Sequence, residues 1–423
     1  STPSNSSAAS DVYKRQAVYA SEATGMNISV GRISLSFPLN LVVTNVDAAS
    51  PHNDTLLSVR RLQVNVQLLP LLKKQVEVDG ISLQGATVNS NDLIHGMKLN
   101  GTLGELFISS HGVALDPETA IVNKVLLKDT DLSLCLNDTA AADTAASDTT
   151  YWKIILQDID LQNVSFALDM PLDSLSLAAS LDNAILRDGL IDLHKSAYSL
   201  QTFRIKNGRV RYDSGKPLAA DSLPSGLDPS HIALTDIGVK LDSLYYGGRN
   251  MKAIISQFVL KERSGVEIVS ATGRMVSNDK VLRVPSLKLE TRDSYLELNA
   301  AMDWNALDFK DEGLVSARLM ADIGKPDVVR FMGSMDEKFI RQYPSEPLRI
   351  RTGIDGDLNK LKLTTLTAEL PGALGLFARG ELTHLTDSLL RGGDITLEAE
   401  TKDLKFVSTL AEGIEIPYGT RLE

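Results

Sequence analysis

The sequence predicts an all-β fold: one long, twisted and curved antiparallel sheet built from repeated hairpins, with a few short helices. Three observations carry this prediction. Apolar and polar residues alternate with a period of two in many segments, one strand pattern recurs along the chain, and helical spacing is rare. Period-two alternation gives each strand one apolar and one polar face, which is typical of antiparallel sheets with one face away from water. About 20 such strands in one sheet would span roughly 100 Å at ~4.8 Å per strand.

The clearest alternation lies in residues 61–68, where four aliphatic residues are separated by Arg, Gln and Asn. The same alternation appears in residues 75–83, 174–181 and 203–206. Because alternate side chains of a strand share one face, the apolar members of these segments are candidates for an apolar binding surface. The candidates are Leu62, Val64, Val66, Leu68, Val76, Val78, Ile81, Leu83, Leu175, Leu177, Phe203 and Ile205.

A loose internal repeat supports the prediction of stacked hairpins. Each copy consists of apolar alternation, a polar or Gly/Asn turn or kink, and further alternation, and such units stack into an extended sheet. The dipeptides Asp79-Gly80, Asn207-Gly208 and Asp355-Gly356 are typical turn signals. The copies are residues 76–88, 125–136, 154–166 and 203–212.

Two segments have helical spacing. Residues 326–342 place apolar side chains three or four positions apart and begin with Pro326, which suits a first helical turn. Residues 403–411 begin with Asp403, a suitable capping residue. Both helices are expected to be short and to lie across the sheet or at one of its ends.

Both ends of the chain have the character of a fragment. Residues 1–16 end in Ser-Asp-Val-Tyr-Lys-Arg-Gln, which resembles translated sequencing-adapter sequence, so they are set apart from the fold prediction. Residues 419–423 have the pattern of an unfinished strand. The expected organisation is a first β region over residues 17–136, a low-complexity Ala/Asp/Thr loop over residues 137–150, and a continuing repetitive β region over residues 151–423.

The residues that usually carry chemistry form no recognisable site. A net charge of −11 argues against a nucleic-acid partner. The six histidines are scattered, and the single Cys135 excludes an intramolecular disulfide and a cysteine-based zinc site. The Asp129/Asp131 and Asp158/Asp160 pairs lack the Gly and Glu of a calcium loop. The sequence therefore predicts no catalytic residues, no metal site and no cofactor.

An apolar sheet face has to be covered, and two arrangements cover it. A closed sandwich packs it against a second sheet, whereas a curved, taco-like groove covers it with its own walls or with apolar ligands. Aromatic residues make up only 5% of the chain, so the face is mostly aliphatic, which suits acyl chains. Alternation alone does not distinguish a filled core from a lipid-filled groove.

Three segments resemble the AsmA/TamB family. Residues 27–47 (NISVGRISLSFPLNLVVTNVD) are similar to the strand and return strand that follow the membrane anchor in that family. Residues 58–89 are similar to its signature, an alternating strand, an L-L-P-L-L turn at residues 68–72, and V-x-V-x-G-I-x-L-x-G-A-x-V. Residues 356–382 resemble the repetitive strands of its middle region. The resemblance is compatible with residues 17–423.

The resemblance implies a groove related to that of bridge-like lipid transfer proteins. It implies a periplasmic protein of a Gram-negative cell, anchored in the inner membrane by an N-terminal segment that this sequence lacks. The implied function is non-catalytic transport of phospholipid between the inner and outer membranes, with the acyl chains held in the groove. An alternative is a scaffold for outer-membrane protein translocation and assembly with a β-barrel partner. A structural β-sandwich module is the second alternative.

Overall fold

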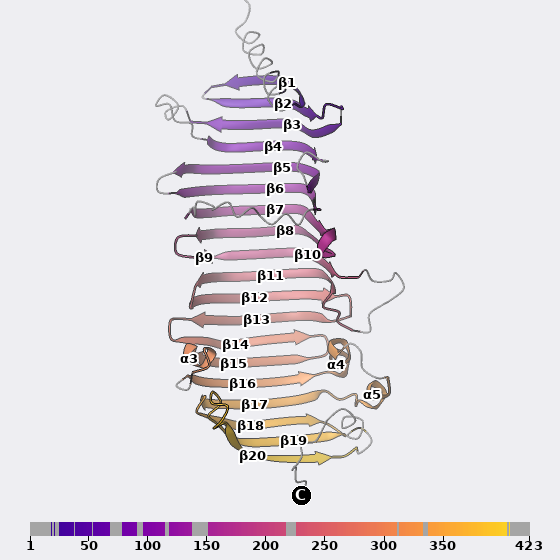
Figure 1. Cartoon of the computed structure of the whole chain (residues 1–423), viewed down its shortest axis with the longest axis vertical. Helices are drawn as coiled ribbons and strands as arrows, with labels where there is room; N and C mark the ends of the chain where they lie inside the picture. Colours follow the sequence, from indigo (N-terminus) through magenta and orange to yellow (C-terminus); the bar gives the residue numbers. More distant parts are fainter. Residues whose placement is uncertain are drawn as a thin grey trace, which may run out of the picture. The chain divides into compact units, whose positions relative to one another are not determined.

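The computed structural model describes residues 18, 21, 25–37, 39–52, 54–67, 78–90, 96–114, 118–137, 151–216, 226–310, 313–332, 337–403 and 406. Twenty strands in this part of the chain belong to one largely antiparallel sheet, which confirms the predicted fold class (Figure 1). The first eleven strands are β1 (Asn27–Ser36), β2 (Asn40–Ala49), β3 (Thr55–Val66), β4 (Val78–Asn89), β5 (Met97–Ala114), β6 (Thr119–Leu136), β7 (Lys153–Met170), β8 (Leu175–Asp192), β9 (Ala197–Leu200), β10 (Thr202–Ser214) and β11 (His231–Gly247). The others are β12 (Asn250–Glu262), β13 (Glu267–Ser277), β14 (Val281–Thr291), β15 (Tyr295–Asp303), β16 (Leu314–Ile323), β17 (Leu348–Asp357), β18 (Lys360–Leu370), β19 (Leu374–Thr383) and β20 (Gly392–Thr401).

The chain divides into two compact units, and each is described separately. Unit 1 comprises Ser1–Ala219 with Ser230–Gly247, and unit 2 comprises Ala220–Pro229 with Gly248–Glu423. The strands β1–β11 belong to unit 1, and β12–β20 belong to unit 2.

In unit 1 most strands pair with their neighbours in sequence. Antiparallel pairing runs from β1 to β6 and resumes from β7 to β8, whereas β6 and β7 are parallel. A parallel pair needs a crossover connection. The residues between β6 and β7 include the predicted low-complexity loop, and residues 138–150 of it lie outside the described part of the chain. The strand β10 pairs with β8 and β11, and the short β9 pairs with the same two strands farther along.

In unit 2 the pairing is simpler. Every strand from β12 to β19 pairs antiparallel with the next strand in sequence. The result is a meander of nine strands, in which local sequence order sets the order of the sheet.

The predicted turn signals and repeat units differ from the observed elements. Asp79-Gly80, Asn207-Gly208 and Asp355-Gly356 all lie inside strands, namely β4, β10 and β17. The described part of each repeated segment falls in one long strand with an interruption in its register, so the segment is not a hairpin. At Asn207 the left-handed backbone, with φ +52°, kinks the strand without reversing it. Asp79 and Asp355 have no left-handed backbone, and their strands continue through them.

Four short helices accompany the sheet in the described part of the chain. The segment 326–342, predicted as helical, forms two helices, α4 (Lys325–Met332) and α5 (Glu337–Gln342). The predicted helix 403–411 lies mostly outside the described residues, but the Phe406 amide donates to Asp403 Oδ1 at 3.1 Å, the contact expected of a capping aspartate. The sequence prediction missed η1 (Pro171–Asp173) and α3 (Trp304–Leu307).

Full burial is rare in the described residues, and it concentrates at the strand ends of unit 2. One cluster joins Tyr343, Leu370, Ala373 and Phe406 and includes Phe339 of α5. The other joins Ala306 of α3 with Val315 and Leu358. Figure 1 shows α3 at one set of strand ends, and α4 and α5 at the opposite set.

Candidate functional site

Two uninterrupted apolar rows cross unit 1 at right angles to its strands. They follow from the register, because residues that are partners across a pair of strands lie on the same face. The first apolar row consists of Ile33, Val43, Leu62, Leu83, Leu106, Leu127, Leu161, Ala184, Ile205 and Val239. The second apolar row consists of Leu35, Leu41, Val64, Ile81, Ile108, Val125, Ile159, Leu186, Phe203 and Leu241.

The sequence candidates fall into these rows. Leu62, Leu83 and Ile205 belong to the first row, and Val64, Ile81 and Phe203 belong to the second. Thus six residues from three strands, far apart in sequence, share one face. Their partners in the other strands, such as Leu106 and Leu161, were not named from the sequence, although they show the same alternation.

The remaining candidates lie nearer the strand ends or beyond the described residues. Val66 and Val78 are register partners at the ends of β3 and β4. Leu175 and Leu177 lie in the other half of β8, and Leu177 shares an apolar row with Leu99, Leu134, Leu168, Tyr212 and Ile232. Leu68 and Val76 lie outside the described residues.

Polar rows alternate with the apolar ones and give the sheet its second face. One such row contains no apolar residue in nine strands, and the side chains in it are Ser29, Asp47, Ser58, Thr87, Thr102, Asp131, Ser165, Ser180 and Arg209. The row between the first and second apolar rows is mixed, because Val42, Phe107, Leu126 and Ile185 stand in it beside six polar residues. The sheet therefore has one aliphatic face and one predominantly polar face.

The exposure of the apolar rows shows how they are covered. In the first and second rows only Ala184 is buried, at 4% exposed, and Leu35 is 56% exposed. The other side chains of the two rows are half-buried. In a closed sandwich the inward-facing residues would be packed at the density of a protein interior. The half-buried rows therefore favour an accessible apolar face and argue against a filled core.

A line across the long strands of unit 1 interrupts their register, and it is called the crease here. At this level the residues are left out of the continuous pairing on both sides. Several of them have a left-handed backbone, with φ near +50° at Asn45, Asp129, Asn163, Asn207 and Asp236 and +61° at Gly85. The crease comprises Gly31, Asn45, Arg60, Gly85, Gly104, Asp129, Asn163, Asp182, Asn207 and Asp236. A shorter interruption crosses β6, β7 and β8 at Asn123, Gln157 and Asp188.

Side-chain hydrogen bonds run along the crease. Asn163 Nδ2 donates to Asp129 Oδ1 at 2.9 Å, and Asn207 Nδ2 donates to Asp182 Oδ2 at 2.6 Å. A side chain in place of the Gly104 hydrogen would approach Asp129 Cβ to 2.8 Å, so glycine permits the close approach of β5 and β6 there. The crease is thus held by Asn and Asp, which tolerate the left-handed region better than other side chains.

Unit 2 has an apolar face of its own. No charged residue interrupts its two central apolar rows. The first consists of Phe258, Ala271, Leu289, Leu296, Ala321, Ile350, Ala368, Leu376 and Ala399. The second consists of Ile255, Gly273, Leu287, Leu298, Leu319, Thr352, Leu366, Ala378 and Leu397.

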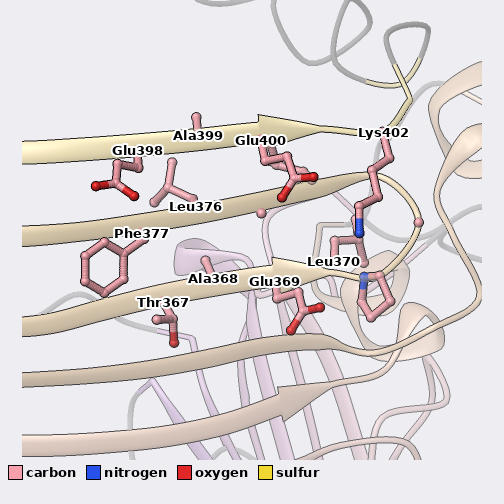
Figure 2. A pocket seen from close by; sticks show the side chains of 14 residues that line it. Thr367, Ala368, Glu369, Leu370, Leu376, Phe377, Glu398, Ala399, Glu400 and Lys402 are labelled. Atoms are coloured by element: carbon pink, nitrogen blue, oxygen red, sulfur yellow. The ribbon is translucent and has the colours of Figure 1, made fainter.

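Figure 2 shows the alternation of faces at the end of unit 2. Glu398 and Glu400 extend to one side of β20, and Ala399 extends to the other. A hollow of about 450 Å³ lies at these strand ends, and its lining includes Glu369, Glu398, Glu400 and Lys402. The lining also contains Ala368, Leu376 and Ala399 of the first apolar row of unit 2, so the hollow combines aliphatic and charged side chains.

A buried polar network fixes α4 to the β14–β15 turn of unit 2. Asp327 is 1% exposed and accepts hydrogen bonds from Ser294 Oγ at 2.6 Å, from Arg330 at 3.1 Å and from Thr291 Oγ1. Arg330 also bonds Asp293 at 2.7 Å. Because the buried carboxylate is fully engaged by these partners, the network holds the helix in place and offers no free group for chemistry.

The polar residues considered as candidate sites either have a structural role or belong to no cluster of metal-ligating side chains among the described residues. Arg187 forms ion pairs with both Asp158 and Asp160, at 3.0 Å for Asp160. Among the described residues, no group of three His, Cys, Asp or Glu side chains is arranged to hold a metal ion. No helix in the described part of the chain is long and apolar enough to span a membrane.

Comparison of the sequence with protein-family models finds no match, and comparison with the curated proteins finds none either.

Proposed function

We propose that the apolar face of the sheet binds the acyl chains of membrane phospholipids and lets them pass from strand to strand without any chemical change. The observation that carries this proposal is the continuity of the first and second apolar rows, which cross ten strands of unit 1 without one charged side chain. A surface of this kind gains free energy from any hydrocarbon in proportion to the area buried, and it has no polar group that would fix a ligand in one place.

The exposure of the rows supports the same proposal. Ten strands spaced by ~4.8 Å give an apolar surface roughly 43 Å long in unit 1. Apart from Ala184, its side chains are half-buried or exposed. Exposed apolar surface of this extent in soluble proteins marks a binding site for apolar ligands or partners. The aliphatic composition of the rows favours acyl chains over aromatic ligands.

The setting of this transport rests on the family resemblance. Residues 58–89, which carry the AsmA/TamB-like pattern, include most of β3 and all of β4, and their alternation supplies four of the row residues, Leu62, Val64, Ile81 and Leu83. We accordingly place the protein in the periplasm of a Gram-negative cell, anchored in the inner membrane, with phospholipid moving between the inner and outer membranes.

Mass spectrometry of lipids extracted from the purified chain tests the proposal directly. We expect phospholipid to be retained at a reproducible ratio of lipid to protein. A lipid-free protein would instead support the structural sandwich module. A photo-crosslinking residue at Leu83 should give lipid adducts. The same residue at Ser82, the next position of β4 on the opposite face, should not. Equal labelling at both positions would show that the lipid does not occupy the apolar rows.

A scaffold for outer-membrane protein assembly is the second candidate, and one observation favours it. Among the described strands β20 pairs only with β19, and on its apolar face Ile395 is 45% exposed and Leu397 is 60% exposed. A strand edge of this kind can template an incoming strand. A photo-crosslinking residue at Thr396 separates the two functions. Adducts of this residue with a client polypeptide would favour the scaffold. Lipid adducts at Leu83 without polypeptide adducts at Thr396 would favour transport.

A further inference from the structure

The crease changes which residues of each strand face the apolar side. In a regular strand, alternate residues share a face, so an apolar residue is expected every second position. In β6 of unit 1, Leu127 belongs to the first apolar row. The next side chain turned to the apolar side is Thr130, which is 3% exposed and lies three residues further along instead of two. The residue between them that belongs to the crease, Asp129, is exposed.

The same shift occurs in other strands of unit 1. In β3, two consecutive residues, Arg60 and Arg61, are both exposed, and Val59 on the far side of them is 6% exposed. In β11, Thr235 and Asp236 are both exposed, and the adjacent Ile237 is 9% exposed. Two consecutive outward side chains keep the apolar residues of both strand halves on one side of the sheet.

The distribution of burial gives the direction of the bend. The crease side chains are mostly exposed, whereas Val59, Thr130 and Ile237, directly next to the crease on the apolar side, are buried. Most other buried side chains of unit 1, such as Ser90, Asp192 and His231, lie near strand ends. When a sheet bends, residues inside the bend become shielded from water and residues outside it become more exposed. The left-handed residues also match this geometry, because strand irregularities of this kind bend a strand and increase its twist.

We propose that the crease folds the sheet of unit 1 toward its apolar face into a trough, and that its left-handed Asn and Asp residues are positioning residues for bound acyl chains. The inference rests on the proposed function for the identity of the ligand. The bend brings the two halves of each strand to face each other, so that a hydrocarbon chain contacts two apolar walls instead of one. Without the bend the same rows would form a flatter surface that holds hydrocarbon less well.

The test compares two triple variants at Asp129, Asn163 and Asn207. One variant carries valine at all three positions and the other carries glycine. Both remove the side-chain hydrogen bonds along the crease, but only valine disfavours the left-handed backbone, since β-branched residues rarely adopt it and glycine adopts it freely. The comparison therefore isolates backbone geometry from the side-chain hydrogen bonds. If the triple valine variant fails to fold by circular dichroism, Asn163→Val and Asn163→Gly replace the two triple variants.

Two readouts are needed. Spin labels at Gln157 and Asp169 of β7, in a Cys135→Ser background, report the bend, because a straight strand would separate these positions by roughly 40 Å. The glycine variant should keep the shorter distance of the unmodified crease, and the valine variant should lengthen it toward 40 Å. Retained lipid, measured by mass spectrometry, should fall by roughly tenfold in the valine variant because the acyl chain then lies against one wall only, and it should stay unchanged in the glycine variant.

The outcomes separate the inference from the proposed function. A distance near 40 Å in the unmodified crease, or equal lipid retention in folded valine and glycine variants of a lipid-binding protein, would overturn the role of the crease. A bend that responds as expected in a protein that retains no lipid would instead refute lipid binding and confirm the bend alone.

Discussion

Replacement of one apolar-row residue by a charged one tests the function most directly. Val64 is half-buried in the second apolar row, between its register partners Leu41 and Ile81. A carboxylate at this position keeps its hydration and prevents hydrocarbon from lying against the neighbouring side chains. We expect Val64→Glu to leave the sheet folded and to weaken lipid binding.

The magnitude follows from the hydrocarbon that the charge keeps away from the sheet. If the hydrated carboxylate displaces about two or three methylene groups of the bound chain, at ~0.8 kcal/mol for each, binding weakens by roughly 1.6–2.4 kcal/mol. This corresponds to a roughly 15- to 60-fold increase in the dissociation constant. Because Val64 is only half-buried, the cost to folding is expected to be about 1 kcal/mol, which is typical of a point substitution.

The assay is displacement of a fluorescent fatty acid from the purified protein, with far-UV circular dichroism as the check on folding. The matched control is Gln63→Glu, which introduces the same charge at the adjacent residue of β3 on the polar face. It should change affinity by less than about twofold. Equal affinities of the wild-type and Val64→Glu proteins, with β content intact, would refute the assignment of these rows to lipid.

The remaining predictions concern stability in unit 2. Asp327→Ala removes a 1%-exposed carboxylate and should lower the free energy of unfolding in urea by about 3–5 kcal/mol. Glu337→Ala, which removes an 87%-exposed partner of a surface ion pair, should lower it by less than about 1 kcal/mol. Similar losses in the two variants would contradict the buried network. Phe406→Ala should cost about 3–5 kcal/mol, because Phe406 is 1% exposed and packs against two other rings, and a cost below about 1 kcal/mol would show that this cluster does not contribute. Burial raises the pKa of Tyr343 above 10.0, so its neutral form is favoured in the folded state. The associated stability should be present below pH 10.0 and be lost as the pH rises through the raised pKa, and urea midpoints at high pH should show a smaller decrease in Tyr343→Phe.

Much of the fold could be predicted from local sequence because strand identity is a local property. The alternation in residues 61–66 and 203–206 correctly predicts strands with one apolar face, since side chains alternate in any extended chain. The alternation alone puts Leu62, Leu83 and Ile205 on the apolar face of their strands, and the register aligns the three in one row. The segment 326–342 was correctly predicted as helical, although the chain forms two helices there.

The turn assignments failed for a physical reason. An Asn-Gly or Asp-Gly pair favours a left-handed backbone, but the same backbone serves a hairpin turn and a kink inside a strand. At Asn207-Gly208 the strand β10 continues because β8 and β11 pair with it on both sides of the kink. The shift of the apolar alternation at that point, from Phe203 and Ile205 to Val210 and Tyr212, was the signal that distinguishes a kink from a turn.

The sequence by itself determined that this protein is β-rich, with one aliphatic face and no recognisable catalytic motif. Only the tertiary structure decided which strands are neighbours, including the parallel pair β6–β7, and that the left-handed residues of separate strands align into one crease. It also decided that the apolar rows are half-buried rather than packed into a core. The physical reason is that alternation depends on the geometry of one strand, whereas register, bending and cover depend on interactions between residues far apart in the chain.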